Sequence, residues 1–574
     1  MRALLITVGS RGDAEPYISL AQSLRQAGCH VDLFLQKDLM HLSTSLLTRM
    51  ESHNGDVGLV NIHELPFTQM DFYKYVGSPS HGTEPKYDSN PRIRFIGVVT
   101  DVIGELVLPC LPMVLKQCMN VVGDDHGTTT SETLTPKVIV TSSLARPLAM
   151  SVAEKINTQH QSLPPIKVCL IHLQPYVPTD RFPPFSHGAD ACVKRICAIF
   201  DREPSTSHKK VMMGDDHDKH SDQQKNYQIE ECFSMKNHGD DDDNHDHAET
   251  EQYYWELEEF HHKFLEKRLN KTRAKFGLQP LPFDDNYRNA LLGRDGGQTI
   301  IVNAFSNELV PSPISSLPSS SSASSQNDND NRLDNTTTMY NVGALADGYI
   351  PHDWKPPQAL VDFLWECQSN EDSREDEKSG THGPPICIGF GSMPFDKVNQ
   401  ILDALEDETL LLHPNCSNNI ILVGSVFVEH DNDHDDEEKQ MNQKQQHQSY
   451  RRQGRVFAIS SVPYAWLLPQ CSLLVSHGGA GTVHVALRAG IPSVVVPFFG
   501  DQFFFANLLD ALQLGVNAGT TLGDLTKEKL VSAIIRVAES SLSMNKKTRL
   551  VGETIRSCSK LAGVDKLVQI LLEL

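Results

Sequence analysis

Glycine-rich corners that follow predicted buried strands carry the side chains best suited to binding an anion. Residues 473–476 form an apolar strand that runs into Ser-His-Gly-Gly-Ala-Gly-Thr at 476–482, and a helix is expected at 483–489. Glycine lets a ligand approach the backbone closely, and the N–H groups and dipole of a helix start favour negative charge. The corner therefore predicts a phosphate site, with added donors from His477 and Thr482; a tight turn is the alternative.

A carboxylate and an amide follow the next predicted strand. Ser-Val-Val-Val-Pro at 493–497 continues into Phe-Phe-Gly-Asp-Gln, which places Asp501 and Gln502 just beyond the strand. Open α/β sheets bind ligands at this end of their strands, and Asp with Gln offers acceptors and donors for sugar hydroxyls. A structural role for Asp501 as the cap of a helix at 503–512 stays open.

A third corner, Gly-Phe-Gly-Ser ending at Ser392, follows a strand at 386–389 and precedes a helix at 395–405. Two such helix starts in one domain fit a diphosphate held between them.

Near the N-terminus, a Gly-rich loop at 9–12 leaves the first strand, and Asp13 precedes a helix at 17–27. The interpretation of Asp13 is either a helix cap or a carboxylate at the mouth of a cleft.

The elements that must position these residues alternate between strand and helix. Strands at 4–8 and 31–35 flank the helix at 17–27, and this unit implies a parallel sheet. We therefore predict an α/β fold with two packed blocks. Further strands are expected at 137–141, 166–172 and 299–303 in the first block, and at 386–389, 419–423, 456–459, 473–476 and 493–496 in the second.

Polar, low-complexity segments separate these elements. Residues 201–250 and 429–453 are acidic and rich in His or Gln, residues 311–338 are rich in Ser and Asn, and residues 369–383 are charged. Such compositions bury too little apolar surface to offset the entropy of ordering, so disordered insertions are expected. Metal binding by the His/Asp runs is the alternative, which the absence of zinc-ligand spacing disfavours.

The overall composition narrows the class of protein. The chain has 574 residues and a net charge of −22, which disfavours nucleic acid and general adsorption to anionic membranes. The most apolar stretch, 102–115, is interrupted by Glu105 and Pro109, so no membrane span is expected.

The N-terminus lacks a signal-peptide pattern, and the scattered cysteines are expected to be reduced thiols. The expected location is the cytoplasm.

The same residues carry a family resemblance. The C-terminal block resembles the nucleotide-sugar domain of GT-B glycosyltransferases, most closely the sterol 3-beta-glucosyltransferase-like branch. The matching segments are Val-Pro-Tyr-Ala-Trp-Leu at 462–467, the corner at 476–482, Leu-Arg-Ala-Gly at 487–490 and Pro-Phe-Phe-Gly-Asp-Gln at 497–502. Residues 8–17, 174–183 and 340–343 resemble other segments of the same branch.

The resemblance implies two Rossmann-like parallel-sheet domains that face a cleft. Residues 1–350 would bind the acceptor, 351–383 would link the domains, and 384–574 would bind the nucleotide sugar. It further implies an inverting transfer of glucose from UDP-glucose, a co-substrate, to a hydroxyl of a lipid acceptor such as a sterol, without a metal or cofactor. Peripheral membrane contact is expected with such an acceptor.

The resemblance also assigns roles to individual residues. Asp13 would be the base that activates the acceptor, the backbone near Val462 would hold the uracil, and Asp501 and Gln502 would bind the sugar. The diphosphate would contact His477, Gly478, Gly479, Gly481, Thr482 and, from the other helix start, Ser392. An ordinary Asp, with a pKa of about 3.9, is a weak base unless burial raises its pKa.

Two features leave the acceptor and the donor contacts open. Val485 stands where plant small-molecule members carry a Glu that binds ribose, although sterol-type members also lack that Glu. An apolar lining from residues 109–115 and 170–185 would favour a lipid acceptor, whereas the alternative is ordinary core. The other candidate functions are glycosylation of a soluble small molecule and a catalytically silent protein that binds UDP-sugars.

Overall fold

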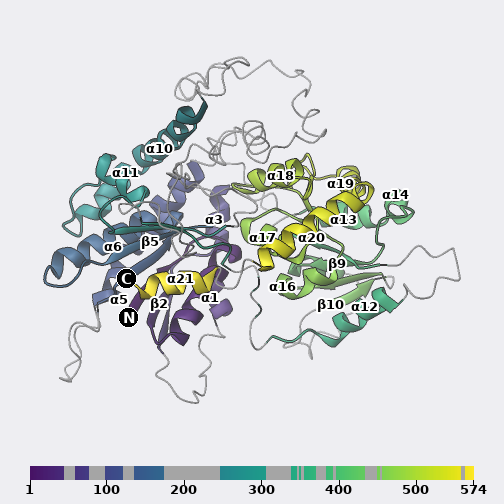
Figure 1. Cartoon of the computed structure of the whole chain (residues 1–574), viewed down its shortest axis with the longest axis horizontal. Coiled ribbons are helices and arrows are strands. Elements are labelled where there is room, and N and C mark those ends of the chain that lie inside the picture. The colour runs from purple at the N-terminus through teal and green to yellow at the C-terminus, as the bar shows by residue number, and fades with distance from the viewer. Residues whose placement is uncertain are drawn as a thin grey trace, which may run out of the picture.

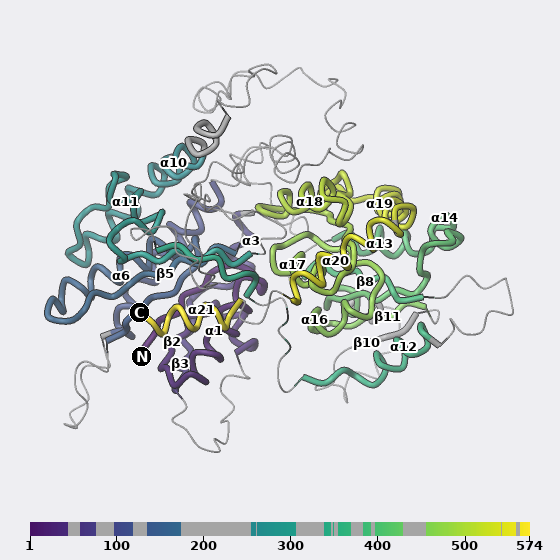
Figure 2. The backbone as a smooth tube through the Cα atoms, viewed as in Figure 1, coloured from purple at the N-terminus to yellow at the C-terminus, as the bar shows by residue number. Residues whose placement is uncertain are grey.

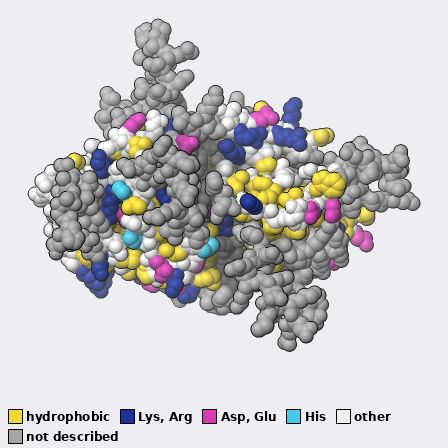
Figure 3. Space-filling model, turned by 90° about the horizontal axis from the view of Figure 1, so that it is seen from below, with side chains coloured by type: hydrophobic (Ala, Val, Ile, Leu, Met, Phe, Trp, Pro, Cys, Tyr) yellow, Lys and Arg dark blue, Asp and Glu magenta, His cyan; other side chains and the backbone are white. Residues whose placement is uncertain are grey.

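The computed structural model contains two domains that lie side by side, each built around a seven-stranded sheet (Figure 1). The structure describes residues 1–43, 58–76, 97–119, 135–173, 246–305, 338–345, 348, 350, 354–369, 383–391, 396–432, 449–452, 455–557 and 563–574. Seen from below, acidic, basic and apolar side chains are interspersed over the described surface of both domains (Figure 3).

The N-terminal sheet is parallel throughout, in the order β3-β2-β1-β4-β5-β6-β7. Its strands are β1 (Arg2–Ile6), β2 (His30–Gln36), β3 (Val60–Leu65), β4 (Val138–Ser142), β5 (Lys167–His172), β6 (Thr299–Asn303) and β7 (Met339–Asn341). Alternate residues of β1 enter opposite cores, with Leu4 and Ile6 in one and Ala3 and Leu5 in the other. The continuous apolar run therefore reflects a strand that is covered on both faces.

The C-terminal sheet has the order β10-β11-β9-β8-β12-β13-β14, parallel except for the antiparallel edge strand β10. Its strands are β8 (Ile386–Gly389), β9 (Ile420–Val423), β10 (Ser449–Arg452), β11 (Val456–Ile459), β12 (Leu473–Ser476), β13 (Ser493–Val495) and β14 (Gly515–Asn517). The prediction of two Rossmann-like parallel-sheet domains is confirmed.

Helices cover these sheets. In the N-terminal half they are α1 (Arg11–Gln26), α3 (Gln69–Val76), α5 (Leu111–Met119), α6 (Arg146–Gln159), α10 (Asp246–Ala274) and α11 (Asp285–Leu291). In the C-terminal half they are α12 (Gln358–Ser369), α13 (Val398–Leu405), α14 (Glu408–Leu411), α15 (Ser425–Asn432), α16 (Tyr464–Leu467), α17 (Ala480–Ala489), α18 (Gln502–Ala511), α19 (Lys527–Glu539), α20 (Ser541–Ser557) and α21 (Val564–Leu572).

Two helices pack elsewhere than their predicted segments suggest. The last helix, α21, leaves the C-terminal domain and packs on α1, so the two chain ends lie close together (Figure 2). Gly563 N donates to Val342 O at 2.6 Å, and Lys566 Nζ donates to Asn341 O at 2.9 Å. Helix α12, expected within the linker 351–383, packs its Phe363 into the C-terminal core.

Several residues expected in disordered insertions belong to ordered elements. Residues 246–250 begin α10, residues 429–432 end α15, and residues 449–452 form β10. At these edges the predicted disorder is wrong. The rest of the predicted insertions 201–250 and 429–453, together with residues 311–337, lies outside the described residues.

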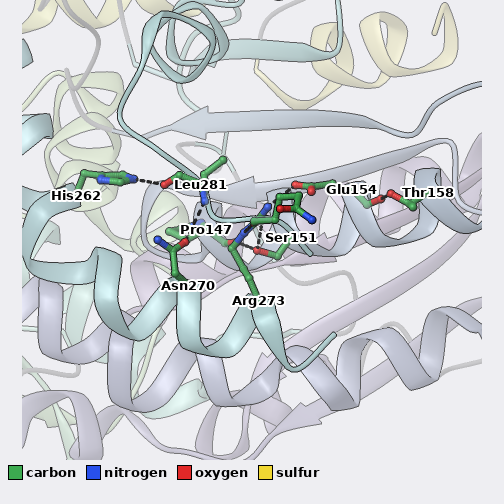
Figure 4. A network of polar contacts seen from close by, with 9 residues as sticks. Pro147, Ser151, Glu154, Thr158, His262, Asn270, Arg273 and Leu281 are labelled. Atoms are coloured by element: carbon green, nitrogen blue, oxygen red, sulfur yellow. Dashed lines mark hydrogen bonds and ion pairs between the residues drawn. The ribbon is translucent and has the colours of Figure 1, made fainter. Parts of the chain in front are cut away.

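A polar network fastens α10 to α6 (Figure 4). The fully buried Arg273 donates to Ser151 Oγ at 3.1 Å and to Glu154 Oε2 at 2.6 Å. His262 Nε2 lies 2.9 Å from Leu281 O, whose residue also donates its N–H to Asn270 Oδ1 at 2.9 Å. Buried polar groups linked in this way hold the long helix in one position.

One described helical stretch, Gly97–Cys118, is long and apolar enough to cross a bilayer by length and composition. In the structure 67% of its most apolar window is buried. Val102, Val107, Leu111 and Val114 all lie in the core beneath the N-terminal sheet. Core helices of soluble domains meet the same criterion, and the packing here is that of a core helix.

Leu567→Ala is expected to destabilise the protein, because Leu567 on α21 is fully buried against the N-terminal domain. Loss of such a side chain costs about 2–5 kcal/mol through lost burial and the remaining cavity. Leu572→Ala on the same helix is the matched control: its side chain is 47% exposed, so a change within about 0.5 kcal/mol is expected. Denaturant unfolding measures both, and equal effects would contradict the docking of α21.

Candidate active site

A cavity of about 410 Å³ opens between the two domains, and we call it the interdomain cleft. Its walls come from loops at the C-terminal ends of β1 and β4 on one side and of β11, β12 and β13 on the other. The predicted site residues that line it are Asp13, Val462, His477, Gly479, Gly481, Thr482, Asp501 and Gln502. The fold thus brings Asp13 into the same cleft as residues of the segment 462–502. The roles of these residues stay predictions.

Asp13 lies in the first turn of α1 and points back toward the start of the helix. Its Oδ2 accepts hydrogen bonds from Ser10 N at 2.7 Å and Ser10 Oγ at 2.9 Å. The N-cap residue is therefore Ser10, with Asp13 as the third residue of a capping box. Burial raises the pKa of Asp13, and the Ser10 hydrogen bonds oppose that rise.

Gly9 makes room for this carboxylate. It has φ of +145°, and a Cβ at this position would lie 2.3 Å from Asp13 Oδ2. Its N–H donates to Gln36 Oε1 at 2.7 Å, which fixes the loop on β2. Any side chain at position 9 would displace the Asp13 carboxylate from the cleft.

His477 occupies a narrow slot beside the start of α17. A Cβ on Gly479 would lie 2.8 Å from its Nε2, and a Cβ on Gly391 would lie 3.3 Å from its Cε1. Burial lowers the pKa of His477 to about 4, so the ring is neutral at pH 7. Its buried Nδ1 has no hydrogen-bond partner among the described residues. A ligand that supplies this partner would remove the cost of an unsatisfied buried polar atom.

The glycines of this corner have different roles. Gly479 is the N-cap of α17 and gives the helix no side-chain cap, so the first-turn N–H groups of Gly481 and Thr482 face the cleft wall. Gly478 does not line the cleft: it has φ of +81°, and a Cβ there would lie 2.4 Å from Val495. Glycine is required at position 478 because of its positive φ and its close packing against Val495. Ser392 lies outside the described residues.

Asp501 occupies the N-cap position of α18 without capping it, so the capping alternative is wrong. Burial, followed by the negative charge of Asp13, raises the pKa of Asp501 to about 7. Hydrogen bonds from its own backbone and from the Ala480 backbone oppose that rise. Two carboxylates from different domains therefore interact across the cleft.

Gln502 is only partly available to a ligand. Its Oε1 accepts from Phe498 N at 2.8 Å and from Phe499 N at 3.0 Å, and these bonds hold the loop that precedes α18. The side-chain amide Nε2 is the polar atom that remains for a ligand. In the predicted pair of Asp501 and Gln502, which together were expected to offer acceptors and donors, Gln502 therefore offers a donor.

Helix α10 adds a largely apolar wall to the cleft that was not predicted from the sequence. His262, Leu265 and Leu269 line the cleft, together with Leu144 and Ile103 from the loops around β4 and the core helix. The spacing of the three α10 residues is that of one helix face, so the signal was present. For residues 109–115 the alternative of ordinary core is confirmed: several of them pack in the N-terminal core, and none lines the cleft. Within 170–185, Leu173 lines the cleft, and residues 174–185 lie outside the described residues.

Known proteins with the same fold and with similar sequence were identified. Spinosyn rhamnosyltransferase SpnG superposes over the full length of both chains with a TM-score of 0.51 and 13% identity. The Streptomyces sp. SF2575 glycosyltransferase SsfS6 gives 0.50 and 14%, with 100% of this chain and 99% of that chain covered. At this identity the likeness shows the fold, which is the GT-B fold of glycosyltransferases.

Sequence comparison gives matches that cover part of this chain. Residues 438–570 match the family of erythromycin biosynthesis protein CIII-like C-terminal domains. A sterol 3-beta-glucosyltransferase of Cryptococcus neoformans is 32% identical over 209 residues, which are 35% of this chain and 11% of that protein. One from Arabidopsis thaliana is 34% identical over 212 residues, 34% of this chain and 30% of that protein.

This chain thus has a GT-B glycosyltransferase fold with a C-terminal domain of the erythromycin CIII-like type. Over about a third of its length it is distantly homologous to sterol 3-beta-glucosyltransferases, and it spans less than a third of the length of these relatives.

Asp501→Asn is expected to stabilise the free protein more at pH 8 than at pH 5. A raised pKa means that the folded state binds the proton more tightly, so stability falls as pH rises from the ordinary value of 3.8 to about 7. The amide removes that loss. Melting temperatures of both proteins at the two pH values measure it.

Asp285→Asn, at an exposed position in α11, is the control and is expected to give the same small change at both pH values. A stabilisation by Asp501→Asn that is equal at pH 5 and pH 8, or larger at pH 5, would contradict the raised pKa.

Proposed function

We propose that this protein is an inverting glycosyltransferase that moves glucose from UDP-glucose to a hydroxyl of a lipid acceptor, a sterol in the first instance. The observation that carries the proposal is the position of Asp13. This carboxylate from one domain shares the interdomain cleft with His477, the α17 start and Asp501 from the other. The similarity to sterol 3-beta-glucosyltransferases over about a third of the chain supports the choice of donor.

The donor half of the reaction rests on α17. Its N-cap residue, Gly479, provides no side-chain cap, so in this proposal the N–H groups of Gly481 and Thr482 and the positive end of the helix dipole bind the diphosphate. His477, neutral because of its lowered pKa, adds a ring N–H from the slot between Gly479 and Gly391. The loop at Val462 lines the cleft, and in this proposal its backbone holds the uracil. These donors stabilise the charge that develops on the diphosphate as the glycosidic bond breaks.

The acceptor half rests on Asp13. Its Oδ2 is engaged by Ser10, and no described residue hydrogen-bonds to Oδ1. Oδ1 takes the proton from the acceptor hydroxyl as that oxygen attacks the anomeric carbon, and the bond to the UDP oxygen breaks on the opposite face. The raised pKa makes this carboxylate a stronger base than an exposed Asp.

Asp13 and Asp501 have different roles in the proposed reaction. Asp501 accepts hydrogen bonds from sugar hydroxyls, and Gln502 donates one from its Nε2. Because the negative charge of Asp13 raises the pKa of Asp501, a sugar whose hydroxyls donate to both carboxylates would favour their charged forms. Glucose binding thereby prepares the base for the acceptor.

The acceptor wall is mostly apolar, which favours a lipid. Val99, Ile103, Leu144, Leu265 and Leu269 line this part of the cleft. A sterol ring system fits such a wall because its burial gains about 25 cal/mol per Å² of apolar surface. Peripheral membrane contact, by which such an acceptor would reach a cytoplasmic enzyme, is part of the proposal.

Asp13→Asn is expected to lower kcat for sterol glucosylation by about 10³-fold and to leave the Kd for UDP unchanged, because it removes the general base and keeps the capping acceptor. His477→Ala is expected to weaken UDP binding roughly 10- to 100-fold through loss of a hydrogen bond to a charged group. Radiolabelled transfer from UDP-glucose and calorimetric titration of UDP measure the two effects.

His30→Ala, at an exposed position in β2, is the control and leaves both readouts unchanged. UDP binding by the wild type without any transfer to a total lipid extract would instead show a silent UDP-binding protein. An undiminished kcat in Asp13→Asn would remove Asp13 from the reaction.

The acceptor class is tested with a sterol and a flavonoid side by side at equal concentration. We expect the sterol to give the higher kcat/KM, and Leu265→Asn to lower it for the sterol by about tenfold, because that change places a polar group in the apolar wall. A higher kcat/KM for the flavonoid would show a glycosyltransferase for soluble small molecules.

A further inference from the structure

The first turns of α1 carry a charged pair that faces the nucleotide end of the interdomain cleft. Arg11 Nε donates to Glu15 Oε1 at 2.6 Å, and both side chains line the cleft. Arg11 Nη1 also donates to Ser461 Oγ at 3.1 Å, a hydrogen bond that joins the two domains. The pair therefore lies beside the loop that we assign to the nucleobase.

The cross-domain bond distinguishes this pair from an ordinary ion pair on a helix surface. Exposed pairs of that kind contribute little to stability. Here the guanidinium is held from the opposite domain, and its charge also acts on Tyr464, where it opposes the rise in pKa that burial produces. The carboxylate of Glu15 is thereby held at the cleft, with about a third of its side chain exposed.

On the described wall that faces α1, the carboxylate is Asp501, which we assign to the sugar. Helix α17 contacts α1, and Val485 on α17 lines the cleft with an apolar side chain. A ribose presents two hydroxyls that need acceptors if they are taken out of water. The acidic side chains that line the described cleft are Asp13, Glu15 and Asp501. Asp13 and Asp501 are engaged at the sugar, so Glu15 is the carboxylate left for the ribose.

We propose that Glu15, positioned by Arg11, accepts hydrogen bonds from the ribose of the bound nucleotide. This inference rests on the proposed function, because it assumes a uridine nucleotide in the cleft. The acceptor-binding domain then completes the nucleotide site that the other domain begins. Because α1 already contacts α17, a nucleotide with an intact ribose is held by both domains beside Asp13.

Calorimetric titration of the full-length protein with UDP, 2′-deoxy-UDP and 3′-deoxy-UDP tests the assignment. We expect the wild type to bind UDP about tenfold more tightly than at least one of the deoxy nucleotides, which is the loss of one hydrogen bond to a charged group. Glu15→Ala should bind all three within about twofold of one another. Glu15→Gln, whose amide oxygen still accepts, should fall between.

Arg11→Ala, which releases the carboxylate, should lower the preference for UDP without changing the affinity for the deoxy nucleotides. Glu259→Ala is the matched control, because Glu259 forms a similar i,i+4 pair with Lys263 on α10 and does not line the cleft. It should keep the wild-type preference. Melting temperatures confirm that each variant is folded.

Two outcomes would overturn the inference while leaving the proposed function intact: a wild type that binds the three nucleotides equally, or a Glu15→Ala variant that keeps the wild-type preference. Failure of the wild type to bind UDP at all would instead contradict the proposed function.

Discussion

The repulsion between two carboxylates that belong to different domains governs the site. Asp13 comes from the first βα corner and Asp501 from a corner nearly 500 residues later, yet the charge of one raises the pKa of the other. Each is also partly buried, and burial raises both pKa values. Such an arrangement is costly in the free protein, and it becomes favourable once hydroxyl donors lie between the two groups.

The rest of the structure keeps the two groups in place. On one side, Gly9 leaves space for the Asp13 carboxylate, and Ser10 holds one of its oxygens. On the other, Gly478 and Gly479 permit the turn that begins α17, whose Ala480 N–H binds Asp501. Helix α21 runs from the C-terminal domain to the N-terminal core and gives the domains a second connection besides the 351–383 segment.

Much of the fold followed from local patterns in the sequence. The strands β6, β8, β11 and β12 have the predicted bounds, because their apolar runs are short and end at glycine or polar residues. Helix α1 begins six residues earlier than expected, since the Ser10–Asp13 capping box extends it through Pro16. Edge strands β3, β7, β10 and β14 were missed: they are short or partly polar, and pairing with a neighbouring strand defines them.

The candidate site was predicted residue by residue, but its interactions were not. Glycine patterns and the family resemblance indicated Asp13, His477 and Asp501, and the structure places all three in one cleft. The sequence could not show that Gln502 Oε1 is occupied by the backbone, or that Arg11 reaches Ser461. Contacts between residues so far apart in the chain depend on the packing of both domains.

A crystal structure with UDP-glucose bound tests the central claim most directly. We expect the diphosphate to lie on the first turn of α17 beside His477. The glucose should lie between Asp13 and Asp501, with its anomeric carbon accessible from the side of Asp13. A nucleotide sugar bound outside the interdomain cleft, or a glucose whose anomeric carbon faces away from Asp13, would contradict this claim.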